Sequence, residues 1–162
     1  MRIREATESD LPAIVEIYNR SIGDGKASTN TQPSTVRRST GWFRQHKTTG
    51  KPILVAEDAG RIVGWLSIRL FYRRPAYNDT GKMLVYVDPG SRGKGIGKGL
   101  VDKALSAGRS CGLNKLVCYV LAENDLAKRL LENSGFESWG KFPGVATMDG
   151  RERDLLVLGR RL

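Results

Sequence analysis

The segment Met83–Leu105 constrains the fold of this chain more than any other stretch. Its first five residues, MLVYV, form an apolar run that is too short for a buried helix and rich enough in Val and Tyr to predict a buried strand. Residues 88–90, Asp-Pro-Gly, end this strand, and the glycine-rich turn RGKGIGKG follows. Apolar residues then recur at helical spacing as far as Cys111. The segment therefore predicts a strand, a glycine loop and a helix in direct succession.

The predicted loop is suited to binding an anion. The first turn of a helix has backbone N–H groups without intrahelical partners, and glycines let an anion approach them closely. Arg92, Lys94 and Lys98 add positive charge. The loop fits neither the P-loop motif nor the G-x-G-x-x-G fingerprint. Instead, Arg92-x-x-Gly95-x-Gly97 resembles the R/Q-x-x-G-x-G/A signature of the GNAT acetyltransferase superfamily, in which this loop binds the pyrophosphate of acetyl-CoA.

The rest of the chain predicts one domain, residues 1–162, with a core of its own. Apolar and alternating runs predict strands at residues 2–6, 53–57, 61–70, 83–87, 115–121, 138–142 and 154–158. Caps and apolar stripes predict helices at about residues 10–22, 33–48, 96–111 and 124–135. We therefore expect an α/β protein with a mixed sheet and helices on both faces. The resemblance to the GNAT superfamily implies the GNAT fold, with a single mixed, mostly antiparallel sheet of about seven strands.

Composition limits the possible partners. The chain has no signal-peptide pattern and no run of eighteen apolar residues, so we expect a cytoplasmic protein without a membrane partner. Its one histidine and two cysteines lack metal-ligand spacing, so we expect no metal. The net charge of +10 favours polyanions such as CoA, acidic surfaces or nucleic acid, although simple solubility explains it equally well. Because no basic run is interleaved with aromatic residues, we do not expect nucleic acid to be the partner.

Several segments resemble one branch of that superfamily more closely. They are IREATESDLPAIVEIYN near the start, RRPAYN in the middle and DGRERDLLVLGRRL at the end, together with Asn124-x-x-Ala127 and Gly135-Phe136. They resemble the phosphinothricin acetyltransferases, which acetylate the amino group of small amino-acid-like molecules. The resemblance extends over essentially the whole chain, and it implies acetyl-CoA as co-substrate and a homodimer.

The resemblance also implies roles for particular residues. The backbone of the predicted central strand would contact the pantetheine arm of the cofactor, through Val85, Tyr86 and Val87. The loop would hold the pyrophosphate, through Arg92, Gly93, Lys94, Gly95, Ile96, Gly97 and Lys98. Two asparagines would lie near the cofactor, Asn124 and Asn133, and one loop would line the amino-acid pocket, Pro75, Ala76 and Tyr77. Asn124 could equally be a plain helix cap, and Tyr86 could be a core residue.

This sequence departs from the branch at both of its usual proton-transfer positions. Lys82 replaces the glutamate that commonly precedes the strand Tyr by four residues, and Leu131 replaces the Tyr or His that often follows the asparagine by seven. Three explanations remain open. Another carboxylate, Asp79 or Glu123, takes the proton through water; Lys82 binds an anionic group of the substrate; or the activity has moved to a new substrate or weakened.

Candidate catalytic groups are few. Asp79 is the first candidate for accepting the amine proton, with Tyr77 beside it, although Asp79 could be a plain turn residue. Tyr86, Tyr119 or solvent could protonate the departing thiolate, which needs little help near neutral pH. The strand before the loop could supply an N–H for the oxyanion.

We therefore expect an acetyl-CoA-dependent N-acetyltransferase that acts on the primary amine of a small amino-acid-like substrate by direct attack in a ternary complex. Two alternatives stay open. One is a peptide or protein N-acetyltransferase. The other is a CoA-binding protein, or a nucleic-acid-binding regulator, in which catalysis has weakened or been lost.

Overall fold

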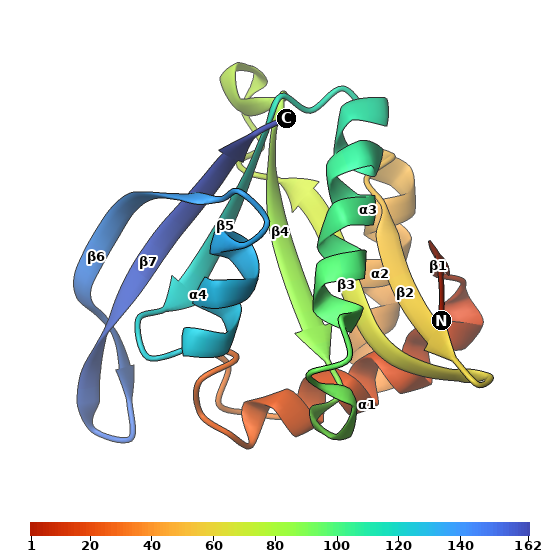
Figure 1. Cartoon of the computed structure of the whole chain (residues 1–162), viewed down its shortest axis with the longest axis horizontal. Coiled ribbons are helices and arrows are strands. Elements are labelled where there is room, and N and C mark those ends of the chain that lie inside the picture. Colours follow the sequence, from red (N-terminus) through yellow and green to blue (C-terminus); the bar gives the residue numbers. More distant parts are fainter.

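The computed structural model describes residues 1–162 and shows one seven-stranded sheet with four helices, in the predicted order of elements (Figure 1). The strands are β1 (Arg2–Glu5), β2 (Ile53–Asp58), β3 (Arg61–Leu70), β4 (Thr80–Val87), β5 (Lys115–Leu121), β6 (Glu137–Met148) and β7 (Arg151–Arg161). The helices are α1 (Leu11–Ile22), α2 (Val36–Thr49), α3 (Ile96–Ser110) and α4 (Asp125–Glu132). The strand order is β1-β2-β3-β4-β5-β7-β6, and only β4 and β5 are parallel neighbours. The predicted α/β fold with a mixed, mostly antiparallel sheet is confirmed.

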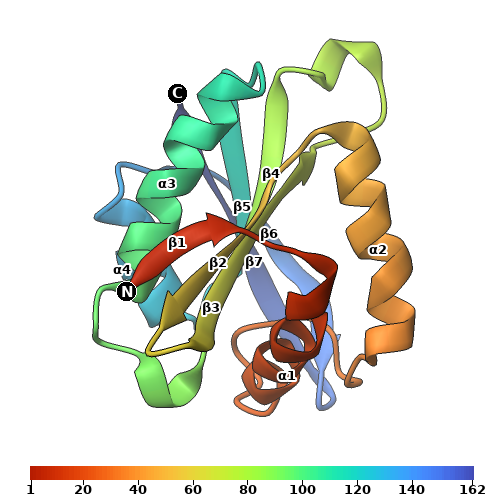
Figure 2. The ribbon, with the colours of Figure 1, turned by 90° about the vertical axis from the view of Figure 1, so that its right-hand side faces the viewer.

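The helices cover both faces of the sheet, as Figure 2 shows, with α3 and α4 on one side and α1 and α2 on the other. Because side chains alternate along a strand, each face has its own core. Leu100 of α3 packs in the larger core, together with Leu66 and Leu116 of the sheet. Phe43 of α2 packs in the smaller core with Trp65. No helix is long and apolar enough to cross a membrane.

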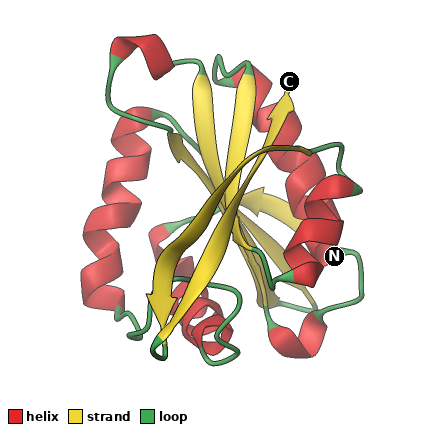
Figure 3. Cartoon of the chain, turned by 90° about the vertical axis from the view of Figure 1, so that its left-hand side faces the viewer, coloured by secondary structure: helices red, strands yellow, loops and turns green.

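Three strands are longer than predicted. Strand β4 begins at Thr80, because residues 80–82 pair with β5 and residues 81–82 also pair with β3. Strands β6 and β7 form a long twisted hairpin (Figure 3). Pro143-Gly144, which follows the predicted strand 138–142, lies within an irregularity of β6, where Asp154 accepts a hydrogen bond of 2.8 Å from the Gly144 N–H. The chain reverses at Asp149-Gly150, where both residues have positive φ.

Helix α2 begins later than predicted and buries a histidine. Thr35, not Pro33, precedes its first turn, and the Thr35 side chain accepts a hydrogen bond from the Arg38 N–H. The side chain of His46 in α2 is buried, and its ring lies 4.8 Å from that of Trp42. Burial lowers the pKa of His46, so this side chain is neutral at physiological pH.

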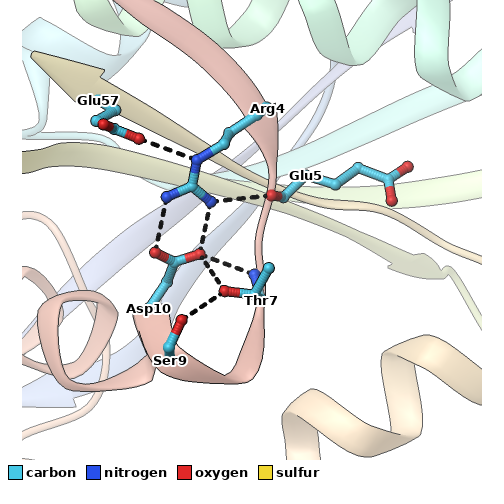
Figure 4. A network of polar contacts seen from close by, with 6 residues as sticks. All are labelled: Arg4, Glu5, Thr7, Ser9, Asp10 and Glu57. Atoms are coloured by element: carbon cyan, nitrogen blue, oxygen red, sulfur yellow. Dashed lines mark hydrogen bonds and ion pairs between the residues drawn. The ribbon is translucent and has the colours of Figure 1, made fainter. Parts of the chain in front are cut away.

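An ion-pair network fixes the start of α1 against the sheet (Figure 4). The guanidinium of Arg4 in β1 donates to both oxygens of Asp10, at 2.7 and 2.9 Å, and to Glu57 of β2 at 3.0 Å. Asp10 also accepts from the Thr7 N–H at 2.8 Å. These hydrogen bonds, those from Arg4 above all, lower the pKa of Asp10. The network therefore places α1, which forms one wall of the cavity described below.

Candidate active site

The two parallel strands at the centre of the sheet separate along their length. They pair only where Thr80–Lys82 of β4 faces Lys115–Val117 of β5. Beyond that point β4 and β5 diverge, as Figure 1 shows, while β4 keeps its pairing with β3. The β5-facing edge of residues 83–87 therefore has no strand partner, so its backbone N–H and C=O groups are available to a ligand.

A first cavity, of about 390 Å³, lies at the open end of this gap, between the end of β4, the glycine turn, and the start of α4. Most of the residues predicted to bind the cofactor line it, namely Val85, Tyr86, Val87, Arg92, Gly93, Gly95, Ile96, Gly97, Lys98 and Asn124. Two do not. Lys94 lies exposed in the turn, and Asn133 lies exposed at the far end of α4 from Asn124. The cofactor roles of Lys94 and Asn133 stay predictions.

The glycine turn fits a pyrophosphate. Gly93 and Gly95 have φ of +78° and +77°, and no atom lies within 4 Å of where a Cβ would stand. At Gly97, by contrast, a Cβ would lie 2.9 Å from Leu130, so glycine lets α3 approach α4. The turn therefore leaves open space in front of the N-terminal N–H groups of α3, where an anion is favoured. Arg92 lies beside this space, paired with Asp24 at 3.3 Å.

Asn124 has the helix-cap role that the sequence allowed, and its cofactor role stays a prediction. Its Oδ1 accepts a hydrogen bond of 3.1 Å from the Ala127 N–H, which caps α4. Its Nδ2 donates at 3.2 Å to the carbonyl of Lys26, in the loop that follows α1. Asn124 is thus a helix cap that also holds the Lys26 loop beside the first cavity.

A second cavity, of about 740 Å³, opens toward α1 and α2 and shares lining residues with the first, among them Lys26, Val85, Tyr86 and Asn124. Tyr86 therefore stands where the two cavities meet. Its ring lies 5.4 Å from that of Tyr18 and 4.9 Å from that of Trp65. Burial raises the pKa of Tyr86 to about 12. At neutral pH its hydroxyl is protonated, so it can donate a proton but cannot serve as a base.

The two residues that replace the usual proton-transfer groups, Lys82 and Leu131, both line the second cavity. Leu131 lies in the hydrophobic core and also lines this cavity. Lys82 is half-buried, with its Nζ 4.2 Å from the centre of the Tyr119 ring. Burial, and to a lesser extent the charge of Arg69, lowers the pKa of Lys82. No aspartate or glutamate lines the second cavity.

Two predictions for the acceptor side need correction. Asp79 lies seven residues before Tyr86 on an extended chain, about 23 Å away, and its carboxylate accepts from Lys115 and Asn114, each at 3.0 Å. These hydrogen bonds lower the pKa of Asp79, which makes it a weak base far from the cavities. Residues 75–77 form an exposed turn and line neither cavity, and the Tyr77 ring packs 5.8 Å from that of Phe71. We therefore withdraw Asp79 as proton acceptor and residues 75–77 as lining of this pocket.

Some lining residues of the second cavity were not predicted. They come from α1, the loop after it, α2 and β3, and include Tyr18, Ser28, Arg38, Trp65 and Arg69. The apolar stripe of α1 marked Tyr18 as buried but gave no reason to place it in a cavity. Arg69 stands at a polar position of an alternating strand, and only its pairing with Lys82 across β3 and β4 reveals its site. No group of three or more His, Cys, Asp or Glu side chains is placed to hold a metal ion.

Comparison with known proteins agrees with this geometry. The profile of the Acetyltransferase (GNAT) family matches residues 11–136. The chain is 40% identical, over 100% of its length and 99% of the relative, to Bacillus subtilis YwnH, which is provisionally named a phosphinothricin acetyltransferase. It is 34% identical, over 96% of its length and 91% of the relative, to the L-methionine sulfoximine/L-methionine sulfone acetyltransferase of Pseudomonas paraeruginosa.

A solved structure extends the likeness to three dimensions. The phosphinothricin acetyltransferase of Sinorhizobium meliloti, crystallised in complex with AcCoA, superposes with a TM-score of 0.94 at 28% identity, over 99% of this chain and 88% of that one. The profile match and the two sequence relatives extend over most of the chain, including the diverging strands and the glycine turn. The chain therefore belongs to the GNAT family of acetyltransferases and is an N-acetyltransferase.

Proposed function

We propose that this protein transfers the acetyl group of acetyl-CoA to the primary amine of a small amino-acid-like molecule, by direct attack within a ternary complex. One observation carries the proposal. The two cavities share lining residues beside the gap between β4 and β5 and meet at Tyr86, so a cofactor in one can face an acceptor in the other. The names of the relatives support an amino-acid-like acceptor.

The residues of the first cavity would hold acetyl-CoA. The open turn at Gly93 and Gly95 and the N-terminus of α3 would bind its pyrophosphate, and the unpaired edge of residues 83–87 would bind its arm. When bound, acetyl-CoA supplies a thioester carbon that accepts the amine nitrogen as the thiol leaves, so one proton must leave the amine and one must reach the sulfur. Holding both reactants in place accounts for much of the rate, up to ~7 to 11 kcal/mol of the barrier.

Proton transfer in this chain depends on few side chains. Because no carboxylate lines the second cavity, water is the acceptor of the amine proton. Glu123 lines the first cavity, where an ion pair with Arg153 holds its carboxylate. The Tyr86 hydroxyl, protonated at neutral pH, is the candidate donor to the thiolate.

The test is thiol release from acetyl-CoA across a panel of free amino acids, methionine sulfoximine and short peptides, each compared with the rate without acceptor. We expect turnover with at least one free amino acid or analogue. Turnover with peptides alone would assign the protein to peptide acetylation and refute the proposal. Silence throughout, with acetyl-CoA binding detected by calorimetry, would support the reading that catalysis has weakened.

A further inference from the structure

Two cationic side chains lie side by side in the second cavity, which we assign to the acceptor. Arg69 of β3 and Lys82 of β4 are direct partners in the antiparallel register, so their side chains project from the same face of the sheet. Both line the second cavity and also a neighbouring cavity of about 350 Å³. The pair therefore stands where these two cavities adjoin.

Neither cation has an acidic partner. None of the twelve salt bridges of the structure includes Arg69 or Lys82. Neither cavity is lined by an aspartate or glutamate, whereas Lys26 and Arg38 add further positive charge to the second. Like charges directly opposite each other on neighbouring strands are destabilising. An anion bound between Arg69 and Lys82 would remove this repulsion.

Arg69 is exposed, and Lys82 is the member of the pair that differs from an ordinary surface lysine. Lys82 is half-buried, and its Nζ lies over the Tyr119 ring at 4.2 Å from the centre. Burial and the charge of Arg69 lower the pKa of Lys82. The aromatic face of Tyr119 acts in the opposite direction, because a cation over an aromatic ring is stabilised in its charged form. A bound anion would also stabilise the charged form of Lys82. The loss of water around Lys82 also strengthens its attraction to an anion.

The position of the pair indicates which anionic group it would bind. Lys82 precedes Tyr86 by four residues of extended strand, about 13 Å between their Cα atoms. The acceptor amine must reach the junction of the cavities near Tyr86. The α-carboxylate of an amino acid is attached to the same carbon as the amine, so it stays beside the amine near Tyr86. An acidic group at the end of the side chain can extend toward Lys82.

We propose, building on the proposed function, that Arg69 and Lys82 form a subsite for the acidic side chain of the acceptor. The preferred substrates are then amino acids with two anionic groups, the α-carboxylate and a distal acid such as the side-chain carboxylate of glutamate. Lys82 acts as a specificity residue and takes no part in proton transfer.

The experiment compares acceptors that differ only in the distal charge, glutamate with glutamine and aspartate with asparagine. The readouts are kcat/KM for thiol release and calorimetric binding of each amino acid to the CoA-bound protein. Two charge-assisted hydrogen bonds predict that the wild-type protein favours the acidic member by about 10- to 100-fold or more. Lys82→Met and Arg69→Met should each remove at least about tenfold of this preference, through KM.

Two further variants separate specificity from proton transfer. Lys82→Arg keeps the charge but cannot serve as a base, so it should retain kcat and the acidic preference. Lys82→Glu reverses the charge and should favour neutral, methionine-like acceptors. Arg61→Met, at the far end of β3 and exposed, removes an equal charge outside both cavities and should leave the preference unchanged.

The two proposals fail in different ways. Transfer to glutamine or methionine sulfoximine at least as fast as to glutamate would keep the proposed function and overturn the subsite. Absence of transfer to any acceptor, with glutamate still binding more tightly than glutamine, would overturn the proposed function and support the subsite. Loss of kcat with every acceptor in Lys82→Arg would overturn the specificity role, and equal binding of glutamate and glutamine would overturn the subsite.

Discussion

Replacing Gly95 by glutamate should abolish CoA binding without unfolding the protein. A Cβ at Gly95 meets no atom within 4 Å, so the new side chain is accommodated without a steric clash. The cost to the fold is the left-handed backbone, φ +77°, which disfavours residues other than glycine by about 1 to 2 kcal/mol. In a protein of this size that cost lowers Tm by only a few degrees.

The loss of CoA affinity should be much larger than this loss of stability. The side chain would enter the open space that we assign to the pyrophosphate and add a negative charge beside it. Two like charges about 5 Å apart near a protein surface repel by about 3 kcal/mol, which corresponds to about a 100-fold weaker Kd. The side chain also blocks the space for the pyrophosphate, so about 100-fold is the minimum weakening of CoA binding that we expect.

Gly112 provides a matched control. It has φ +80°, its Cβ position is also open, and it follows α3 at the other end, about 22 Å from the glycine turn. Gly112→Glu should lose the same stability and keep its CoA affinity. Both variants can be measured by thermal unfolding and by calorimetric titration with CoA. A Gly95→Glu variant that binds CoA within threefold of wild type, or a Gly112→Glu variant that loses as much affinity, would refute the assignment of the pyrophosphate site.

Three more predictions concern single side chains. Asn124→Ala should lose about 1 kcal/mol of stability with the helix cap. It should also weaken CoA binding several-fold, because the Lys26 loop is released. Calorimetric titration should show an unchanged CoA affinity if the asparagine is only a cap. Tyr86→Phe should keep CoA affinity and lower kcat by up to about 10²-fold if the hydroxyl protonates the thiolate, and an unchanged kcat would assign that proton to water. Asp10→Asn should destabilise the protein by about 1 to 3 kcal/mol at pH 7. Arg4 lowers the pKa of Asp10 in the folded state, so this stabilisation is present above the ordinary pKa of 3.8 and is lost as the pH falls through the lowered pKa. Denaturant unfolding should therefore show that the difference in free energy of unfolding between wild type and variant becomes smaller in acid.

Local patterns predicted the elements of this fold but not their full lengths. The run from Met83 to Val87 identified the central strand, because a continuous apolar segment has few alternatives. Thr80–Lys82 escaped notice since polar and glycine residues have low strand propensity, and only pairing with β3 and β5 makes them extended. The predicted strand 138–142 ends before Pro143-Gly144 for the same reason, although β7 holds these residues within an irregular part of β6.

The cofactor side of the site was predictable because it is built from one continuous segment. The residues from Arg92 to Lys98 bring their own glycines and charges, so their spacing alone describes an anion site. The acceptor side is assembled from α1, α2, β3, β4 and β5, and no local spacing relates Arg69 to Lys82 or Tyr18 to Tyr86. Asp79 and residues 75–77 were misplaced for that reason, because nearness in sequence to β4 does not mean nearness to its open end.

This division also explains how a GNAT protein can lack both common proton-transfer side chains. The cofactor site depends on backbone geometry, namely the separation of β4 from β5 and the positive φ of Gly93 and Gly95, which substitutions at Lys82 or Leu131 do not alter. The acceptor site depends on side chains that project from the sheet and can change independently. Replacing a carboxylate by Lys82 next to Arg69 changes the charge of that site without disturbing the cleft. A change in the preferred acceptor is therefore the expected consequence of such a substitution, and loss of the fold or of CoA binding is not.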